Sequence, residues 1–328
     1  MKNSARVLST GSYLPERVLT NHDLEQMVDT SDEWIVSRTG MRERRIARAD
    51  EFTSDMGAKA AEEALKRAGK TAQEIDLILV ATITPDYLFP STAALIQSVL
   101  KAPQAAAFDF QAACTGFLYG LSLAKGFIES GIYQNILLIA SEKLSSIVDY
   151  QDRNTCVLFG DGAAAAVISN SGPGFSIRES CLGADGEVAN LLFLPAGGCR
   201  KPATAETVKN GEHFLAMEGK EVFKHAVRRM EAAAKECLRL ADLPEAEIDW
   251  LVPHQANERI IDAIAKRFSI DESKVFKTVH KYGNTSASAV AIALDELLQT
   301  EEISSGENVL LVAFGAGFTW GATLLTAI

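Results

Sequence analysis

The residues best suited to chemistry are a cysteine, a histidine and an asparagine that lie far apart in the chain. Cys114 occurs in "AFDFQAACTGFLYGLSLAKGF", where a run of small residues gives way to a helical apolar pattern. A cysteine in the first turn of a helix lies at the positive end of the helix dipole, which stabilises the thiolate and lowers the thiol pKa. His254 in "VPHQAN" and Asn284 in "YGNTSA" carry N–H donors that can hold a developing oxyanion. Each residue alone is more often structural, so the prediction of thiol chemistry depends on their meeting in space.

An internal repeat indicates how they meet. Residues 61–79 match residues 234–252 without gaps, so that Asp76 pairs with Asp249 at an offset of 173. At the same offset "NILLIA" (135–140) falls on "NVLLVA" (308–313), and Cys114 falls on Ala287. The helix after Asn284 is therefore the predicted twin of the helix that begins at Cys114.

Each half is predicted to run helix, strand, helix, strand, helix, strand, strand. The segments "IDLILVAT" (75–82) and "NILLIAS" (135–141) are continuously apolar, as expected for parallel strands that are covered on both faces. The helix that begins at Cys114 is apolar nearly all round, which predicts a buried helical layer between the halves. We expect residues 1–173 to carry the nucleophile, and residues 174–328 to carry the histidine and the asparagine.

Composition excludes several classes of protein. A net charge of −11 argues against nucleic-acid binding, and five cysteines without a CxxC pair suggest neither a disulfide framework nor a zinc site. We expect a cytoplasmic protein that does not enter a membrane, because the N-terminus lacks the apolar run of a secretory signal. The uncharged tail 308–328 is as long as a membrane span, but its glycines and its twin predict two buried strands joined by a turn.

Six blocks in order resemble the β-ketoacyl-acyl carrier protein synthase III family, a group of thiolase-fold condensing enzymes that initiate fatty acid synthesis. The resemblance covers essentially the whole chain and lies in these blocks: "DEWIVSRTGMRERR" (32–45), "FDFQAACTGF" (108–117), "FGDGAAA" (159–165), "VPHQAN" (252–257), "YGNTSA" (282–287) and "FGAGFTWG" (314–321). It implies an α/β thiolase fold, with two duplicated halves packed as a five-layered αβαβα sandwich.

The resemblance also implies roles for the candidate residues. Cys114 would take the acyl group of acetyl-CoA or another short acyl-CoA, and His254 Nε2–H and Asn284 Nδ2–H would hold the enolate formed when malonyl carrier protein loses CO2. Backbone N–H groups of Cys114 and Ala316 would hold the second oxyanion. The products would be acetoacetyl carrier protein, CoA and CO2. No cofactor is implied beyond the carriers of the substrates.

Binding surfaces follow from the same resemblance. The positions that match the family's CoA site are Trp34, Arg38, Thr39, Arg153 and Phe223, with Trp34 and Arg153 expected to sandwich the adenine. The expected docking residues for an acidic acyl carrier protein are Gln255, Ala256, Asn257, Glu258, Arg259, Lys224, Lys266 and Arg267. Phe89 would reach across the interface of a homodimer to cap the acyl pocket and favour acetyl groups. We expect Arg42, Arg44 and Arg45 to form a solvated charged surface.

Two positions depart from the family pattern. Ala316 occupies the middle of a loop that is usually "GGG", and its amide can still donate a hydrogen bond if its φ is negative. Lys220 stands where asparagine is frequent before the docking phenylalanine, which puts one contact to CoA in doubt.

Other interpretations remain at this point. The spacing of Cys114, His254 and Asn284 also fits a papain-like hydrolase, although such enzymes carry the cysteine near the mature N-terminus. A dinucleotide loop at "FGAGFTWG" lacks the chain needed for the following helix and strand. Hydroxymethylglutaryl-CoA synthase is disfavoured because its acid/base glutamate motif has no evident counterpart in this sequence. A non-catalytic binding protein is disfavoured because it would not need Cys114, His254 and Asn284 together. A starter condensing enzyme of secondary metabolism is the main alternative.

Overall fold

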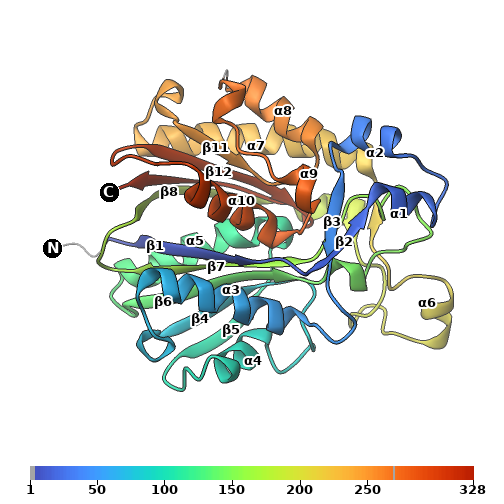
Figure 1. The fold of residues 1–328 in the computed structure, drawn as a ribbon, viewed down its shortest axis with the longest axis horizontal. Coiled ribbons are helices and arrows are strands. Elements are labelled where there is room, and N and C mark those ends of the chain that lie inside the picture. The colour runs from blue at the N-terminus through green and yellow to red at the C-terminus, as the bar shows by residue number, and fades with distance from the viewer. Residues whose placement is uncertain (1–3, 269) are drawn as a thin grey trace.

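The computed structural model describes residues 4–268 and 270–328, and its core is a strongly twisted nine-stranded sheet (Figure 1). The N-terminal half contributes, from the outer edge inward, β5 (Ala106–Phe110), β4 (Leu77–Ala81), β6 (Asn135–Glu142), β7 (Gly162–Ser169) and β1 (Arg6–Tyr13). The C-terminal half continues with β8 (Phe175–Ala184), β13 (Thr319–Ala327), β12 (Asn308–Gly315) and β11 (Trp250–Pro253). In the described part of the chain, only two residue pairs join β1 to β8. The strands of the N-terminal half and those of the C-terminal half therefore form two largely separate parts of the sheet.

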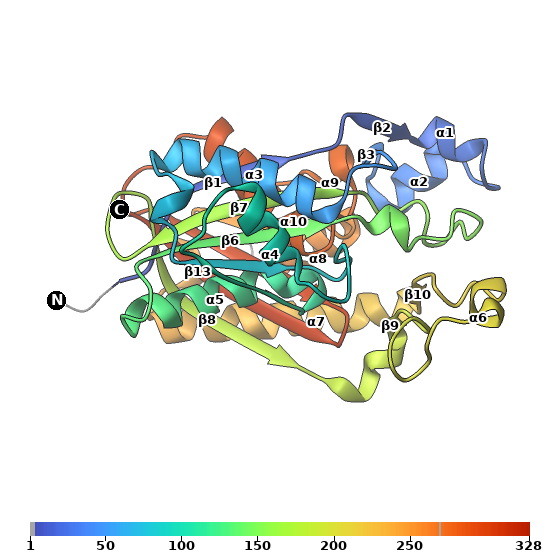
Figure 2. The ribbon, with the colours of Figure 1, turned by 90° about the horizontal axis from the view of Figure 1, so that it is seen from below.

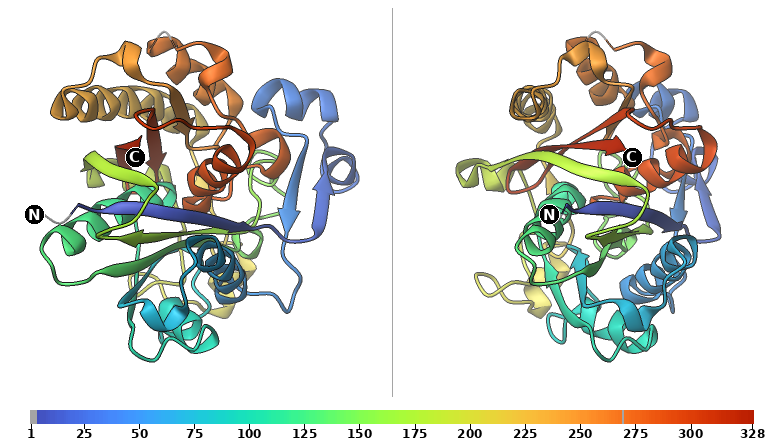
Figure 3. Two further views of the ribbon diagram at one scale, coloured as in Figure 1. Left: turned by 60° about the vertical axis from the view of Figure 1, so that its left-hand side comes forward. Right: turned by 90° about the vertical axis from the view of Figure 1, so that its left-hand side faces the viewer.

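Six helices complete the layers. α3 (Thr53–Ala68) and α4 (Thr92–Val99) cover one outer face, while α7 (Gly219–Ala241) and α8 (Glu258–Arg267) cover the other (Figure 3). α5 (Gly116–Glu129) and α10 (Ala287–Thr300) lie between the two halves. Neighbouring residues of a strand alternate between layers, since Leu77 and Leu79 pack against α5 and α10 whereas Ile78 and Val80 pack under α3. The predicted five-layered thiolase fold is confirmed.

The repeat read from the sequence has an exact structural counterpart in hydrogen bonds. The Asp76 carboxylate accepts the backbone N–H of Asn135 at 2.8 Å, and the Asp249 carboxylate accepts that of Asn308 at 2.8 Å. Each asparagine also donates its side-chain amide over 3.1 Å to a backbone carbonyl, of Glu74 in one half and of Glu247 in the other. The same contacts thus fix the strand register in both halves. The tail forms the predicted antiparallel pair of buried strands, β12 and β13.

Two excursions, which the sequence pattern did not predict, extend beyond one end of the layers (Figure 2). The first comprises β2 (Arg17–Thr20), α1 (Asn21–Glu25), α2 (Asp32–Thr39) and β3 (Glu43–Ile46), and the second comprises β9 (Leu192–Phe193), α6 (Ala205–Lys209) and β10 (Ala216–Met217). The second strand predicted for the C-terminal half is reduced to one bridge, between Leu251 and Val275. It is followed by the short helix α9 (Val279–Tyr282). The turn between β7 and β8, at residues 170–174, contains the expected boundary between the halves.

Arg44 corrects one of our expectations. We expected it on a solvated surface, but its side chain is fully buried. Its guanidinium donates to Asn21 Oδ1 at 2.8 Å and to the Val157 carbonyl at 2.7 Å, and burial lowers its pKa to about 10. Arg44 therefore holds the first excursion against the loop before β7, where its many donors replace water.

Small residues let the central helices approach the strands. A Cβ atom placed on Gly116 would lie 2.8 Å from the Ala81 Cβ, and one placed on Gly120 would lie 2.3 Å from Leu138 Cδ1. Both glycines are therefore required by contact distance. Among the residues that the structure describes, no helix combines the length and apolarity of a membrane span.

We predict opposite effects for two glycine-to-alanine changes on α5. Gly120→Ala forces its methyl group into Leu138 and should lower the free energy of unfolding by about 1–3 kcal/mol. Gly126→Ala, on the same helix with open space around it, should raise that free energy by about 0.5–1 kcal/mol. Urea denaturation at one fixed protein concentration measures both, and equal effects would contradict the packing argument.

Candidate active site

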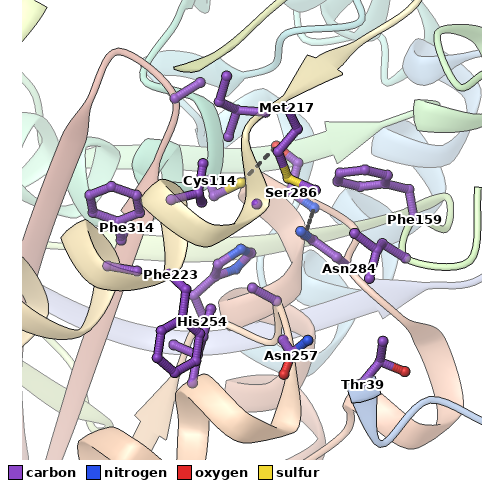
Figure 4. A pocket seen from close by; sticks show the side chains of 18 of the residues that line it. Thr39, Cys114, Phe159, Met217, Phe223, His254, Asn257, Asn284, Ser286 and Phe314 are labelled. Atoms are coloured by element: carbon purple, nitrogen blue, oxygen red, sulfur yellow. Dashed lines mark hydrogen bonds between the residues drawn. The ribbon is translucent and has the colours of Figure 1, made fainter. Parts of the chain in front are cut away.

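Cys114, His254 and Asn284 come together at the wall of one cavity (Figure 4). The cavity has a volume of 680 Å³ and extends from the central helices to α2 and α7. Cys114 comes from the turn between β5 and α5, His254 follows β11, and Asn284 precedes α10. The predicted meeting of the three residues is therefore observed, and their side chains point into the same space.

A tight turn presents the Cys114 thiol. Cys114 is the middle residue of a 3₁₀ turn, Ala113–Thr115, which ends directly before α5 begins. Ala113, the residue before Cys114, has a φ of 46°. The end of β12 packs directly behind this turn, since a Cβ atom on Gly315 would lie 2.7 Å from the Cys114 nitrogen. Only glycine fits there without displacing the turn.

The environment of the thiol differs from our expectation. We expected the helix terminus to lower the pKa of Cys114, but burial raises the pKa to about 12, and the nearby Glu142 carboxylate adds to the increase. Desolvation of a thiolate in this apolar cavity outweighs the helix dipole. The thiol is thus protonated in the resting protein and needs a proton acceptor when it reacts.

His254 is buried and neutral. Its backbone N–H donates to the Val312 carbonyl at 2.7 Å, which extends the β11–β12 pairing to the edge of the cavity. Burial lowers the pKa of its ring to about 3, so the imidazole is uncharged near neutral pH. Neither ring nitrogen has a hydrogen-bond partner within the described part of the chain, which leaves an N–H free for a ligand.

The orientation of the Asn284 amide is fixed. Its Oδ1 accepts the Ser286 backbone N–H at 2.8 Å, so its Nδ2 group is the end left for a ligand. Its backbone is anchored as well, because its N–H donates to the Leu158 carbonyl at 2.8 Å and its carbonyl accepts from Gly160 at 3.1 Å. An asparagine held in this way is a pre-oriented donor beside neutral His254.

Ala316 also lines the cavity, directly after β12. The non-glycine residues with positive φ, as far as the structure describes the chain, do not include Ala316, and the left-handed conformation falls instead on Gly317, with a φ of 133°. The alanine therefore fits the backbone without the strain that a positive φ would bring.

Two further polar residues at the site were missed by the sequence analysis. Ser286 places its Oγ 3.7 Å from Cys114 Sγ, and the same hydroxyl donates to Glu142 Oε1 at 3.1 Å. The repeat could have pointed to them: Ser286 is the twin of Ala113 at the offset of 173, and Glu142 is the twin of Gly315. Ser286 even shares the positive φ of its twin, at 54°.

Four of the five expected CoA residues line the cavity, namely Trp34, Arg38, Thr39 and Phe223, and Lys220 lines it too. Arg153 lies outside this lining but stacks on Trp34, with its guanidinium carbon 4.8 Å from the ring centroid. The two planes are thus in mutual contact, with Arg153 also donating to the Asp29 carbonyl at 2.7 Å. A base could enter between them only if Arg153 moved away from the ring.

The expected docking residues divide into three groups. Gln255 is buried, donates to the carbonyls of Pro253 and Phe276, and accepts two backbone N–H groups, so its side chain is engaged inside the protein and its contact with a partner stays a prediction. Ala256, Asn257 and Arg259 line the mouth of the cavity, and Asn257 caps α8. Lys224 also lines the cavity, whereas Glu258, Lys266 and Arg267 lie outside the lining.

Phe89 lies away from the cavity of its own chain. Its side chain is 86% exposed, next to Leu88 at 87% and Tyr87 at 61%. Such a run of exposed apolar side chains is costly in water, so the segment needs another surface to cover it.

Comparisons with known proteins agree with this geometry. Residues 108–186 match the family model of 3-oxoacyl-[acyl-carrier-protein (ACP)] synthase III, and residues 238–327 match that of its C-terminal part. The chain is 65% identical to the β-ketoacyl-[acyl-carrier-protein] synthase III of Chlamydia caviae over 325 residues, which covers 99% of this chain and 97% of the relative.

Solved structures show the same relationship. The 3-oxoacyl-[acyl-carrier-protein] synthase III of Aquifex aeolicus superposes with a TM-score of 0.91 at 46% identity, covering 98% of this chain and 99% of that one. The priming β-ketosynthase of the R1128 polyketide biosynthetic pathway also reaches a TM-score of 0.91, at 37% identity, covering 99% of this chain and 97% of that one. Given the fold, the meeting of thiol, imidazole and amide, and these matches along the whole chain, the chain belongs to the β-ketoacyl-[acyl-carrier-protein] synthase III family.

Proposed function

We propose that this protein carries out the initiating condensation of fatty acid synthesis, joining a short acyl group from acyl-CoA to malonyl-ACP with release of CoA and CO2. The observation that carries the proposal is the convergence of Cys114, neutral His254 and the oriented Asn284 amide on one cavity. One thiol can hold an acyl group, and two neutral donors can hold an enolate oxygen.

In the first half-reaction the Cys114 sulfur attacks the thioester carbonyl of acetyl-CoA. The carbonyl oxygen becomes an oxyanion, for which the backbone N–H groups of Cys114 and Ala316 are the proposed donors. The C–S bond to CoA then breaks, CoA leaves as the thiol, and the acetyl group stays on Cys114. The cavity runs from this turn to Trp34 and Arg38, which gives the pantetheine arm and the nucleotide a continuous path to the surface.

In the second half-reaction malonyl-ACP loses CO2. The electron pair of the broken C–C bond moves into an enolate whose oxygen accepts hydrogen bonds from His254 and Asn284. The enolate carbon attacks the acyl group on Cys114, the bond from that carbon to the sulfur breaks, and acetoacetyl-ACP is the product. Cys114 leaves as the thiolate and takes up one proton from solvent to become the thiol again. A neutral imidazole is suited to this step because it donates a hydrogen bond without protonating the enolate carbon.

Labelling tests the proposal directly. The protein is mixed with radiolabelled acetyl-CoA, label is sought on Cys114, and the product is identified after addition of malonyl-ACP or malonyl-CoA. Acetoacetyl-ACP is the expected product. A starter condensing enzyme of secondary metabolism would instead prefer another acyl group or carrier, and peptide hydrolysis without acyl transfer would revive the papain-like interpretation.

We predict that the two half-reactions respond to different substitutions. Cys114→Ala should abolish acetyl transfer but keep decarboxylation of malonyl-ACP. His254→Ala and Asn284→Ala should keep acetyl transfer and each lower decarboxylation about 10²–10³-fold, because each removes one oxyanion donor. Label on the protein and released CO2 measure the two steps separately. Equal loss of both steps in either donor variant would contradict the assignment.

We also propose that the protein is a homodimer formed across β5. β5 is the outermost strand of the sheet, so the pairing groups along its free edge face outward. Phe108 on β5 is 39% exposed, and the apolar segment that contains Leu88 and Phe89 lies exposed before α4. Pairing of two copies would cover both features and bring Phe89 towards the acyl pocket of the partner.

The five cysteines are all unpaired, which supports a reducing, cytoplasmic location.

We predict a preference for short acyl groups that depends on Phe89. The unmodified protein should be acylated faster by acetyl-CoA than by octanoyl-CoA, because a phenyl group at the end of the pocket leaves little room. Phe89→Ala should shift this ratio towards octanoyl-CoA, whereas the neighbouring control Tyr87→Ala should not. Faster acylation of the unmodified protein by octanoyl-CoA would contradict the proposal.

A small basic surface supports docking of an acidic carrier protein to this acidic chain. Arg259 lies at the mouth of the cavity with its guanidinium carbon 5.8 Å from the Phe223 ring centroid. Lys266 lies further along α8, and its side chain is exposed. Lys224 and Arg267 are less available, because they pair with Glu221 at 2.6 Å and Glu231 at 3.5 Å. We therefore assign most of the attraction to α8.

Charge reversal on α8 should weaken use of the carrier protein selectively. Arg259→Glu and Lys266→Glu should raise the KM for malonyl-ACP and flatten its dependence on salt, because attraction between unlike charges is screened by ions. Lys66→Glu on α3, in the opposite outer layer, is the matched control and should change neither. Steady-state kinetics between low and high salt measure the effect, and an unchanged KM in both α8 variants would contradict this docking site.

A further inference from the structure

The thiol of Cys114 has to lose a proton when it takes up the acyl group, and neither His254 nor Asn284 is suited to accept this proton. Burial keeps the pKa of His254 near 3, so its imidazole is a weak base, and the Asn284 amide takes no proton. The thiol itself is held protonated by its surroundings. A base must therefore lie within reach of Cys114 Sγ.

Glu142, the last residue of β6, is the nearest such group. Its side chain is fully buried, and the groups that donate hydrogen bonds to it are uncharged. Its Oε2 accepts three hydrogen bonds, from Thr82 Oγ1 at 3.1 Å, the Ile83 N–H at 3.0 Å and Thr84 Oγ1 at 2.6 Å. Its Oε1 accepts from Ser286 Oγ at 3.1 Å, which leaves this oxygen with room for a proton.

Ser286 connects the carboxylate with the thiol. Its hydroxyl lies 3.7 Å from Cys114 Sγ, within the range of a hydrogen bond to sulfur (Figure 4). The side chains of Cys114, Ser286 and Glu142 are all buried. The chain of contacts therefore runs from Sγ through one hydroxyl to a carboxylate without bulk water.

The duplicated architecture explains why the carboxylate reaches this position. In the C-terminal half the end of β12, at Gly315, lies behind the Cys114 turn, and in the N-terminal half the end of β6, at Glu142, lies behind the Ser286 turn. The two arrangements are twins at the offset of 173. One copy uses glycine to make room for the Cys114 amide, whereas the other fills the same place with an acid.

We propose that Glu142 accepts the proton of the Cys114 thiol through the Ser286 hydroxyl during acylation and returns it to the departing CoA sulfur. The Sγ proton passes to Ser286 Oγ while the Ser286 proton passes to Glu142 Oε1, and the sulfur forms its bond to the acyl carbon. When the bond between that carbon and the CoA sulfur breaks, the Glu142 proton passes back to Ser286 Oγ while the Ser286 proton passes to the CoA sulfur, which leaves as the thiol. No oxidant or other reactant is needed. The proposal rests on acylation of Cys114 as set out above.

The ionisation of Glu142 fits this role. Burial raises its pKa to about 7, against the lowering effect of its four donors. The titratable groups nearby are Cys114 across Ser286, neutral His254 in the cavity, and Lys143, whose Nζ turns away to the carbonyls of Arg48 and Glu51. A carboxylate with a pKa near 7 can both take and release a proton at neutral pH.

Alkylation of Cys114 by iodoacetamide, followed by peptide mass spectrometry across pH, tests the relay without any substrate. In the unmodified protein the rate should rise through about pH 7 as Glu142 ionises. Glu142→Gln keeps an acceptor for the three donors but cannot take a proton, so it should lose this rise and react about 10²-fold more slowly at neutral pH. If Glu142 only repelled the thiolate, the same variant would react faster, and that result would overturn the proposal.

Ser286→Ala provides a second test that retains the acid. Alanine is compatible with the backbone there, because its twin Ala113 has a similar φ of 46°. This variant should also slow both alkylation and transfer of radiolabelled acetyl groups, while decarboxylation of malonyl-ACP, which needs no thiol proton, stays within about twofold. Unchanged acylation, or equal loss of acylation and decarboxylation, would overturn the relay. Absence of label on Cys114 of the unmodified protein would instead overturn the proposed function.

Discussion

The burial of α5 and α10 between the two halves of the sheet is the constraint on which the remaining structure depends. Because both faces of this layer are covered, the helices can approach the strands only where side chains are small, as at Gly116 and Gly120. The turns that begin the two helices are thereby pressed together in the middle of the molecule. Cys114 and Asn284 meet because each belongs to one of these turns.

The same burial determines the protonation states at the site. Removing water raises the pKa of the Cys114 thiol, lowers that of the His254 ring and raises that of the Glu142 carboxyl. All three groups are thus neutral or easily neutralised near neutral pH. In the proposed reaction, oriented N–H dipoles rather than fixed charges would meet the oxyanions.

Much of this architecture was predictable, for reasons that can be stated residue by residue. The repeat identified the twin helices and the buried tail, because strands covered on both faces and helices buried all round have few acceptable sequences. The meeting of Cys114, His254 and Asn284 followed from the family resemblance and from their places at the ends of strands. The direction of the Cys114 pKa shift did not follow, because the helix dipole is a local property whereas desolvation depends on everything that closes the cavity.

Long-range packing explains the other differences. Arg44 lies among surface-like arginines in the sequence, yet a distant loop carbonyl, that of Val157, removes it from water. Gln255 follows the histidine in a segment that resembles a docking region, but two backbone N–H groups near α9 occupy its side chain. Neither partner is recognisable from neighbours in the sequence. Ser286 and Glu142 escaped notice for the same reason, since only the folded chain places them beside Cys114.

The matched asparagine and aspartate contacts have a meaning beyond strand register. At the end of the sheets away from the cavity the two halves remain alike, with Asp76 and Asn135 repeated as Asp249 and Asn308. At the cavity end four pairs of twins differ: Ala81 and His254, Ala113 and Ser286, Cys114 and Ala287, Glu142 and Gly315. A chimera built from two copies of one half would thus retain its scaffold contacts and possess either two nucleophiles or none. The residues that could carry out catalysis are thus those at which the two halves differ, and they lie at one end of the molecule. At the other end the two halves have kept the same contacts.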